Sequence, residues 1–316
     1  MGLPLISVVI PTFARPHFLE RSIRSALHSA PEGDLEIIVV PNGPDQSWKT
    51  IACEFAKRPE ISWHPITESN ACVARNHGMN VAQGKYIRFL DDDDYLFENA
   101  YLQLQLLDEE GADVSQAGIN WINANSEILR TQNAQSADDF LSSVLQPDFF
   151  TLLHSFIWLL EKRKRYPWNV LLKIGDDVEF ALSPILHEDL RKTSFALPVG
   201  AWVHHGGLRL STDADDLSVS KDLANILLNM AASLKKNGRL TFERRESIVA
   251  RLWQLIHTQF PLAPIYWSYI ARNTLEILPG SHPEDRRFLE FPLRFMHPLM
   301  VEWAFFPYRR LRRILK

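Results

Sequence analysis

Four consecutive aspartates, Asp91 to Asp94, follow a short apolar run in the segment YIRFLDDDDYL. Adjacent carboxylates repel one another, so such a cluster is costly unless it is solvated or neutralised. Apolar residues resume at once with Tyr95 and Leu96, which indicates a packed loop rather than a water-exposed acidic turn. Carboxylate oxygens suit Mg²⁺ or Mn²⁺, and a few carboxylates with substrate phosphates commonly hold such an ion. The cluster therefore predicts metal-assisted handling of a phosphate-bearing substrate.

The aspartates end one of several short apolar runs that are typical of buried strands. We expect strands at 5–10, 35–40, 61–66 and 86–90, and helices at 17–29, 48–57 and 71–83. This alternation predicts an α/β fold whose central sheet is mostly parallel, with helices on both faces. Ligands bind such sheets beyond the carboxyl ends of the strands, where the segments TFAR, NGPD and DDDD would meet.

The rest of the chain has a different pattern. Between residues 113 and 205 the segments AGINWI and SFALPVGAWVHH are strand-like, and helical stretches separate them. Three helical patterns follow, at 224–236, 243–258 and 263–277. We therefore expect an α/β domain over residues 1–217 and a helical C-terminal region over residues 218–316.

Composition narrows the class of protein. The 316 residues are 46% hydrophobic, which is enough to form a hydrophobic core. The formal net charge is −4, which gives no reason to expect a nucleic-acid partner. The two cysteines have no metal-like or disulfide-like spacing, and no run reaches the roughly 20 apolar residues of a membrane span. No signal peptide is visible, so we expect a cytoplasmic protein, either free or peripheral at the inner face of the cell membrane.

Three segments together resemble family 2 glycosyltransferases. SVVIPTFARPHFLERSIRSAL resembles the opening of that family, and ACVARNHGMNVAQGKYIRFLDDDDYL resembles its ARN-x-G, G-x-Y and FLD-x-DD run. EIIVVPNGPD stands where the family commonly has a VVDDGS-like segment. The order and spacing agree across residues 5 to 100. The resemblance implies a GT-A (Rossmann-like) fold and the transfer of a sugar, with inversion, from a nucleotide diphosphate donor.

The same resemblance implies roles for the aspartates. It makes Asp93 the direct metal ligand and Asp91 a nucleotide contact, with Asp92 beside them at the variable position of the motif. The implied cofactor is Mn²⁺ or Mg²⁺.

Three further residues match donor-binding positions of the family. Thr12 and Arg15 match first-loop nucleotide contacts, and Arg75 matches a donor-binding arginine. An arginine also suits phosphate oxygens on chemical grounds alone. Pro41 and Asn42 depart from the family because they replace its paired aspartates, although an asparagine amide can still read a nucleobase edge. The base of the donor therefore stays open, with a UDP-sugar favoured over a GDP- or dTDP-sugar.

An inverting transferase needs a general base for the acceptor hydroxyl. In LLKIGDDVEFAL the resemblance makes Asp177 this base and Asp176 a supporting residue, while HEDL at 187–190 is a competing match. WVHHGG resembles the segment in which many members supply a metal-binding histidine, which would be His205 or, alternatively, His204.

The C-terminal segment is rich in aromatic residues and ends in a basic cluster, RRLRRILK. Such composition is typical of helices that attach to an anionic membrane surface. A helix packed on the protein with a solvated basic tail, or a homo-oligomer interface, would explain it equally. Membrane contact would suit an enzyme that acts on a lipid-linked acceptor.

The sequence leaves three functions open. The first is a metal-dependent glycosyltransferase that acts on a glycan or lipid-linked acceptor, in surface polysaccharide synthesis. The second is a nucleotidyltransferase that makes nucleotide sugars, although PTFARP lacks the glycine expected in its first loop. The third is a catalytically inactive, sugar-nucleotide-binding scaffold subunit, which the unusual Pro41 and Asn42 keep open.

Overall fold

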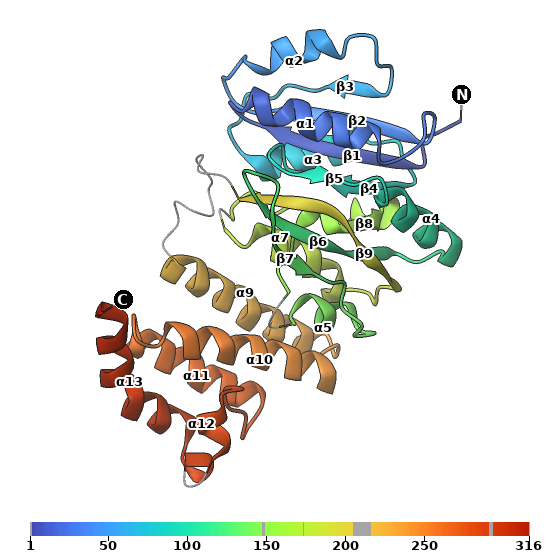
Figure 1. The fold of residues 1–316 in the computed structure, drawn as a ribbon. Helices are drawn as coiled ribbons and strands as arrows, with labels where there is room; N and C mark the ends of the chain where they lie inside the picture. Colours follow the sequence, from blue (N-terminus) through green and yellow to red (C-terminus); the bar gives the residue numbers. More distant parts are fainter. Residues whose placement is uncertain (1, 147–148, 173, 205–215, 291–292, 316) are drawn as a thin grey trace. The chain divides into compact units, whose positions relative to one another are not determined.

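A computed structural model describes residues 2–146, 149–172, 174–204, 216–290 and 293–315 (Figure 1). Within these residues the chain divides into two compact units, one of residues 1–140 with 150–207 and the other of residues 141–149 with 208–316. The first unit contains the sheet and the second consists of helices. No helix of the described ranges has both the length and the apolar character needed to span a bilayer.

The described strands of the first unit form one sheet in the order β3-β2-β1-β4-β8-β6-β9-β5, with β7 paired to β6. The strands are β1 (Ile6–Thr12), β2 (Leu35–Pro41), β3 (Ile61–Trp63), β4 (Tyr86–Phe89), β5 (Tyr95–Leu96), β6 (Val114–Asn123), β7 (Ile128–Gln132), β8 (Phe156–Leu159) and β9 (Lys192–His204). The helices are α1 (Pro16–Leu27), α2 (Trp48–Glu54), α3 (Ala71–Val81), α4 (Ala100–Glu110), α6 (Leu160–Arg163) and α7 (Asp176–Leu182), with the 3₁₀ turns η1 (Leu153–Ser155) and η2 (Ser183–Leu186). The predicted α/β class is confirmed, and the predicted strand at 61–66 is shorter than expected.

The parallel half of the sheet brings three chain segments to one edge. β1 runs parallel to β2 and β4, and β2 runs parallel to β3. Thr12 pairs with Pro41 at the carboxyl ends of β1 and β2, and Val9 pairs with Phe89 near the end of β4. The segments that follow these three strands therefore begin side by side, although they are far apart in the sequence.

Helices cover both faces of this half, as the sequence predicts. Ile6, Val8 and Ile10 of β1 lie in one buried cluster with apolar side chains of α1 and α4. Alternate side chains of a strand point to opposite faces, so Val9 faces the other way. It meets α3 at Gly78, where an added Cβ would lie 2.4 Å from Val9 Cγ1. Glycine at this position lets α3 approach the sheet closely.

The other half of the sheet is mixed. β8 lies antiparallel between β4 and β6, whereas β6 and β9 run parallel over a long, irregular register. The two residues of β5 pair antiparallel with β9, through Tyr95 with Ala201 and Leu96 with Gly200. The aspartate segment is therefore bounded by β4 on one side and β5 on the other, which fixes both of its ends.

The second unit consists of α-helices around their own core, as expected for the C-terminal region. They are α9 (Asp216–Lys236), α10 (Phe242–Gln259), α11 (Pro264–Ile277), α12 (Arg286–Leu289) and α13 (Pro298–Ile314), with η3 (Leu293–Phe295); α5 (Phe140–Val144) joins the two units in sequence. Trp253 of α10 and Trp267 of α11 are among the largest fully buried side chains.

A buried ion cluster ties α13 to α10 within the second unit. The Glu302 carboxylate is 1% exposed and lies 2.5 Å from His257 Nδ1. Arg309 Nη1 donates to the other oxygen of Glu302 at 2.5 Å. A buried carboxylate needs such partners, so this cluster fixes how α13 packs.

Candidate active site

The aspartate segment is linked to the segments after β1 and β2 through Thr12. The Thr12 hydroxyl donates to Asp92 Oδ2 at 2.7 Å, and the Asn42 side-chain amide donates to the Thr12 carbonyl at 3.0 Å. Thr12 and Asn42 are both buried. The structure thus brings these three predicted donor-site residues together at the carboxyl edge of the parallel strands.

Arg15 neutralises two of the four aspartates. Its Nη2 lies 2.7 Å from Asp92 Oδ1 and its Nη1 donates to Asp93 Oδ2 at 2.6 Å. The Asp92 side chain is 1% exposed. Burial raises the pKa of the Asp92 carboxyl to about 7, against the opposing effect of Arg15. Asp92 therefore serves to hold the loop, and its side chain is not open to solvent.

The backbone of the aspartate segment is held by α1. The Ser22 hydroxyl donates to the carbonyl of Asp92 at 2.8 Å and also to that of Asp94. Arg21 Nη2 donates to the Asp93 carbonyl. No sequence motif pointed to Ser22 or Arg21, and helical periodicity alone marks Ser22 as a position on the buried face of α1.

Asp94 connects the segment to β9. Its Oδ1 accepts from the Val203 amide at 3.0 Å, and its Oδ2 lies 3.5 Å from Nδ1 of the buried His154. Burial lowers the pKa of His154 to about 4, so its imidazole is neutral near pH 7. The sequence did not point to His154, because no motif surrounds it.

Arg75 bridges the aspartate segment and the predicted catalytic motif. Its Nη2 donates to Asp91 Oδ1 at 2.7 Å, and its Nη1 donates to Asp176 Oδ2 at 3.1 Å. The Arg75 side chain is 8% exposed, whereas that of Asp91 is 36% exposed. Burial, which raises the pKa of Asp91, is outweighed by the ion pair with Arg75, so this pKa lies below its usual value. Asp91 is therefore a charged carboxylate that reaches the surface.

A tryptophan to which no sequence motif pointed supports Arg75. The Trp168 ring lies 4.6 Å from the guanidinium carbon of Arg75 and stacks on Phe180 of α7, with centroids 3.8 Å apart. Asn76 holds Trp168 through two reciprocal hydrogen bonds, since its Nδ2 donates to the Trp168 carbonyl at 2.9 Å and its Oδ1 accepts from the Trp168 amide at 2.8 Å. Arg75 and Asn76 are neighbours in ARNHG, so one turn of α3 positions both.

The predicted base lies at the start of α7. Helix α7 begins at Asp176, after Gly175 in the left-handed conformation with φ 74°. Asp177 is half-buried, and its Oδ1 accepts from the Val178 amide at 2.8 Å. Burial and the adjacent Asp176 raise the pKa of Asp177 to about 7. A carboxylate with this pKa suits general base chemistry near neutral pH.

Asp176 is held in place by two partners. Besides Arg75, the Cys72 thiol donates to Asp176 Oδ2 at 3.3 Å. Burial and Asp176 raise the pKa of Cys72 to about 12, so the thiol stays protonated and acts as a donor. Asp176 is thus held by two side chains of α3. The carboxylate of Asp177 accepts instead from the backbone of its own helix, at the Val178 amide.

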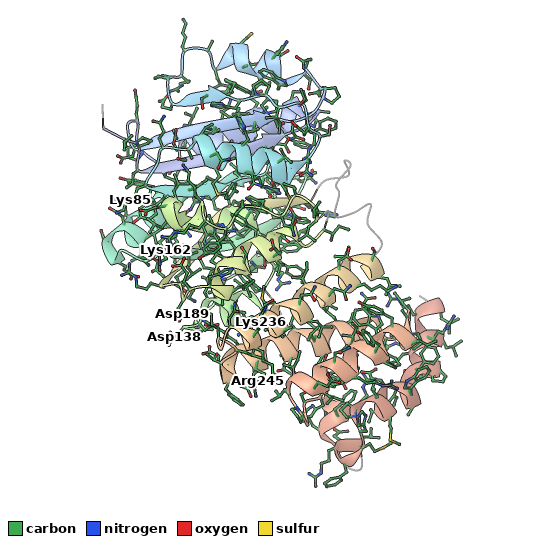
Figure 2. All side chains as sticks on the ribbon, turned by 180° about the vertical axis from the view of Figure 1, so that it is seen from behind. Lys85, Asp138, Lys162, Asp189, Lys236 and Arg245 are labelled. Atoms are coloured by element: carbon green, nitrogen blue, oxygen red, sulfur yellow. The ribbon has the colours of Figure 1, made fainter. Side chains whose placement is uncertain are left out.

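The competing HEDL segment is engaged in a separate ion-pair network. Figure 2 labels Lys162 and, from the HEDL segment itself, Asp189. Lys162 lies 3.1 Å from Glu188 Oε2 and 2.9 Å from Asp113 Oδ2, and the Tyr166 hydroxyl donates to Glu188 Oε1 at 2.9 Å. These partners hold the pKa of Glu188 below its usual value, although burial acts in the opposite direction. A strongly paired carboxylate of low pKa is a poor proton acceptor, which argues against Glu188 as the base and leaves Asp189 as the competing candidate of this segment.

Of the two predicted metal-binding histidines, only His204 lies within the described residues. His204 ends β9 as an exposed side chain that stacks on Trp202, with centroids 5.9 Å apart, and His205 lies outside the described residues. The described ranges contain no group of three His, Cys, Asp or Glu side chains that could hold a metal ion.

The aspartates nevertheless fit a divalent cation in their chemistry. Asp91 is charged and partly exposed, and Asp93 has a guanidinium, that of Arg15, as a close partner. Hard carboxylate oxygens of this kind suit Mg²⁺ or Mn²⁺.

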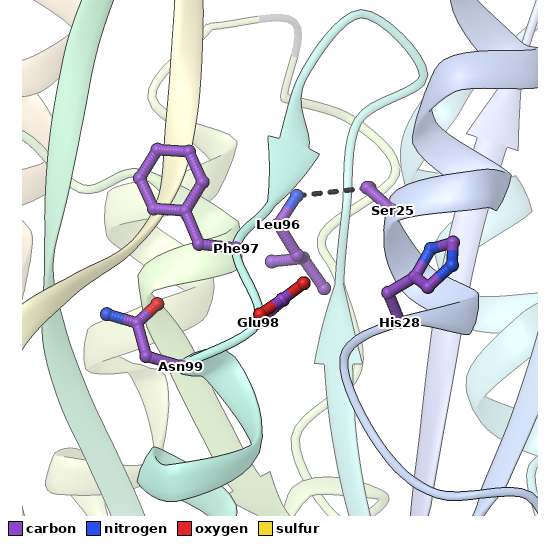
Figure 3. A pocket seen from close by; sticks show the side chains of 6 residues that line it. All are labelled: Ser25, His28, Leu96, Phe97, Glu98 and Asn99. Atoms are coloured by element: carbon purple, nitrogen blue, oxygen red, sulfur yellow. Dashed lines mark hydrogen bonds between the residues drawn. The ribbon is translucent and has the colours of Figure 1, made fainter.

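A hollow of about 700 Å³ lies along the last turn of α1 (Figure 3). It is lined by Ser25, His28, Leu96, Phe97, Glu98 and Asn99. This lining contains one carboxylate and no arginine or lysine, so it lacks the permanent positive charge that favours a diphosphate. The aspartate segment remains the candidate donor site.

Comparison with known proteins shows the family of the chain and its fold. Residues 7–170 match the model of Glycosyl transferase family 2. A Campylobacter jejuni GalNAc(5)-diNAcBac-PP-undecaprenol beta-1,3-glucosyltransferase is 26% identical over 179 residues, which are 51% of this chain and 55% of that protein. The chain spans less than two thirds of the length of four curated glycosyltransferase relatives, between 19% and 55%.

Two solved structures share the fold. S. aureus TarS 1-349 in complex with UDP-GlcNAc superposes with a TM-score of 0.69 at 16% identity, covering 87% of this chain and 82% of that one. A Pyrobaculum calidifontis mannosyltransferase in complex with GDP-Man and Mn²⁺ gives a TM-score of 0.52 at 13% identity, covering 98% and 88%.

Proposed function

Because the chain belongs to glycosyl transferase family 2, we propose that it transfers a sugar, with inversion, from a nucleotide diphosphate donor to an acceptor hydroxyl. The observation that carries this proposal is the Arg75 bridge between Asp91 and Asp176. It joins the predicted donor-binding motif to the predicted base motif, although they are far apart in the sequence.

In this mechanism Arg75 and Arg15 bind and orient the diphosphate. Guanidinium groups pair well with phosphate oxygens and can stabilise charge that develops on a leaving nucleoside diphosphate. Arg75 is suited to this because Trp168 and two carboxylates fix its orientation. Thr12 and Asn42, which are buried and joined to each other, would shape the edge of the nucleotide site.

Asp177 is the proposed general base. Its pKa of about 7 keeps a large fraction of the carboxylate ready to accept the proton of the acceptor hydroxyl near neutral pH. Asp176, held by Arg75, would keep the first turn of α7 in register with the donor site. Inversion by direct displacement requires no covalent intermediate with the protein.

We propose Mn²⁺ or Mg²⁺ as the cofactor, held by Asp93 with a contribution from His205 or His204. A bound cation would act as a Lewis acid on the diphosphate. The Mn²⁺ complex of the mannosyltransferase with the same fold supports this proposal for the fold as a whole.

A UDP-sugar donor and a lipid-linked or glycan acceptor are the favoured substrates. The UDP-GlcNAc complex of TarS supports the donor, and the undecaprenol-linked acceptor in the name of the C. jejuni relative supports the acceptor. Such an acceptor would place the enzyme at the inner face of the membrane, in surface polysaccharide synthesis.

The test is calorimetric titration with UDP, GDP and dTDP, each with and without Mn²⁺, for the wild-type protein and for Asp93→Ala. We expect one nucleotide to bind tightly only with Mn²⁺, and Asp93→Ala to abolish this binding. Glu188→Gln, in the separate ion-pair network, is the control and should bind as the wild type does. Absence of nucleotide binding by the folded wild-type protein would refute the donor site.

Donor turnover then separates the transferase from an inactive scaffold. Release of nucleoside diphosphate from a donor sugar, at a rate that depends on Asp177, supports the transferase. Tight binding without any turnover, with membrane extracts supplied as acceptor, would support the scaffold.

A further inference from the structure

Helix α13 of the second unit has two apolar faces, and one of them is exposed. Its inward face contains Val301, which is fully buried, and Glu302, which is 1% exposed. On the other side Met300 is 59% exposed and Leu311 is 58% exposed. A single-sided surface helix would bury its apolar stripe and expose polar residues instead.

The exposed apolar residues lie on one line along the helix. Met300, Ala304, Pro307 and Leu311 follow one another at intervals of three or four residues, which places them on the same side of an α-helix. We call these four residues the outward stripe. Trp303 turns inward instead, since its Nε1 donates to Ser268 Oγ at 3.1 Å. A continuous exposed stripe of this kind marks an interaction surface more often than scattered apolar side chains do.

Exposed arginines flank the outward stripe. Arg310, Arg312 and Arg313 are exposed, and Arg309 turns inward to Glu302. No aspartate or glutamate follows Glu302 in the chain, so the last three turns of α13 carry only positive charge. By the helical angle of 100° per residue, Arg310 lies on one side of the stripe and Arg312 on the other.

We propose that the outward stripe of α13 binds an anionic lipid surface, with the helix lying in the plane of the interface. Apolar side chains would enter the boundary between headgroups and acyl chains, while Arg310 and Arg312 pair with lipid phosphates on both sides. Charge decides between this partner and a second copy of the chain. A second copy would bring another helix whose last three turns hold no acidic residue to pair with the arginines, whereas an anionic lipid surface supplies phosphates on both sides.

The test is flotation of the full chain with vesicles of phosphatidylcholine alone and of phosphatidylcholine mixed with phosphatidylglycerol. We expect binding to the anionic vesicles only, and weaker binding as salt rises, because salt screens exposed charges. Replacing both Arg310 and Arg312 by alanine should weaken binding about 25-fold, from about five-fold for each charge. Lys57→Ala with Arg58→Ala removes the same charge from an exposed turn of the first unit and should leave binding unchanged.

A second pair of variants tests the apolar contribution. Leu311→Ser should weaken binding by about ten-fold or more, since burial of a leucine side chain is then lost. Leu3→Ser, at a site that is 78% exposed in the first unit, is the matched control. Neither leucine is buried, so both variants should fold, and equal far-UV circular dichroism spectra would verify this.

Two results would overturn the proposal. One is equal affinity of the wild type for neutral and anionic vesicles, or no affinity for either. The other is self-association of the lipid-free chain in sedimentation velocity that Leu311→Ser abolishes, which would assign the stripe to a second copy. Neither result would count against the proposed transferase site. That site is tested by nucleotide titration, which is carried out without lipid.

Discussion

Asp177→Asn tests the proposed chemistry with little disturbance of the fold. Asparagine keeps the size of the side chain and an oxygen that can accept from the Val178 amide, as Asp177 Oδ1 does at 2.8 Å. It cannot accept the proton of the acceptor hydroxyl. Loss of a positioned general base costs about 10²- to 10⁴-fold in rate. We expect kcat to fall by this amount while the affinity for the nucleotide stays within about two-fold.

The pH dependence of the wild type should report the same carboxyl. Burial and Asp176 raise the pKa of Asp177 to about 7, and the base works only when deprotonated. Activity should therefore fall as the pH drops through 7, to about one-tenth of its plateau at pH 6, because one pH unit changes the ratio of the two forms ten-fold. Asp176→Asn removes the adjacent negative charge, so it should move this acid limb to lower pH.

Stability supplies a second readout of the same pKa. A carboxyl whose pKa is raised by folding stabilises the protein below its unfolded pKa, and this contribution is lost as the pH rises through the folded value. Asp177→Asn has no charge to bury. Its urea midpoint, relative to that of the wild type, should therefore increase between mildly acidic pH and pH 8.

The assay is release of nucleoside diphosphate from the donor across this pH range, for Asp177→Asn, Asp176→Asn and Asp189→Asn. Asp189→Asn represents the base position of the competing HEDL segment and should keep the wild-type rate at its plateau. The reasoning is refuted if Asp177→Asn retains the wild-type rate, and loss of the rate in Asp189→Asn alone would assign the base to HEDL. If the activity of Asp176→Asn falls at the same pH as that of the wild type, then the charge of Asp176 does not raise the pKa of Asp177.

Three further variants test the packing that holds the site and the C-terminal helices. Asn76→Ala should lower the free energy of unfolding by about 1–3 kcal/mol in urea titration, because the Trp168 amide and carbonyl each lose a partner. Gly78→Ala should cost about 1–3 kcal/mol by the same measurement, since its Cβ would lie 2.4 Å from Val9 Cγ1, and Val9→Ala in the same chain should restore part of the loss. Glu302→Ala should cost about 3–5 kcal/mol by thermal denaturation, because its buried arginine and histidine partners lose their carboxylate; no loss would show that this cluster does not stabilise α13.

The parallel half of the sheet was predictable because its signals are local. The β-branched runs at 5–10 and 35–40 are long enough to predict buried strands, and β1 and β2 cover them. β5 has two residues and β8 has four, so neither carries a period that a sequence can display. β9 was visible as an apolar run, but its pairing with β6 depends on contacts between distant segments.

The donor site was predictable only as far as its residues belong to motifs. Arg75 and the aspartates stand in ordered segments, so their types and spacing indicate a phosphate site. Trp168 stands in no motif, and the sequence offers no reason to connect it with Asn76. Yet the Trp168 ring lies against both Arg75 of α3 and Phe180 of α7. A shift of this ring would displace the Arg75 guanidinium, which we propose binds the donor, together with the helix of the proposed base. In the proposed mechanism the alignment of the donor with the base thus depends on one aromatic side chain that tertiary packing, rather than local sequence, brings into position.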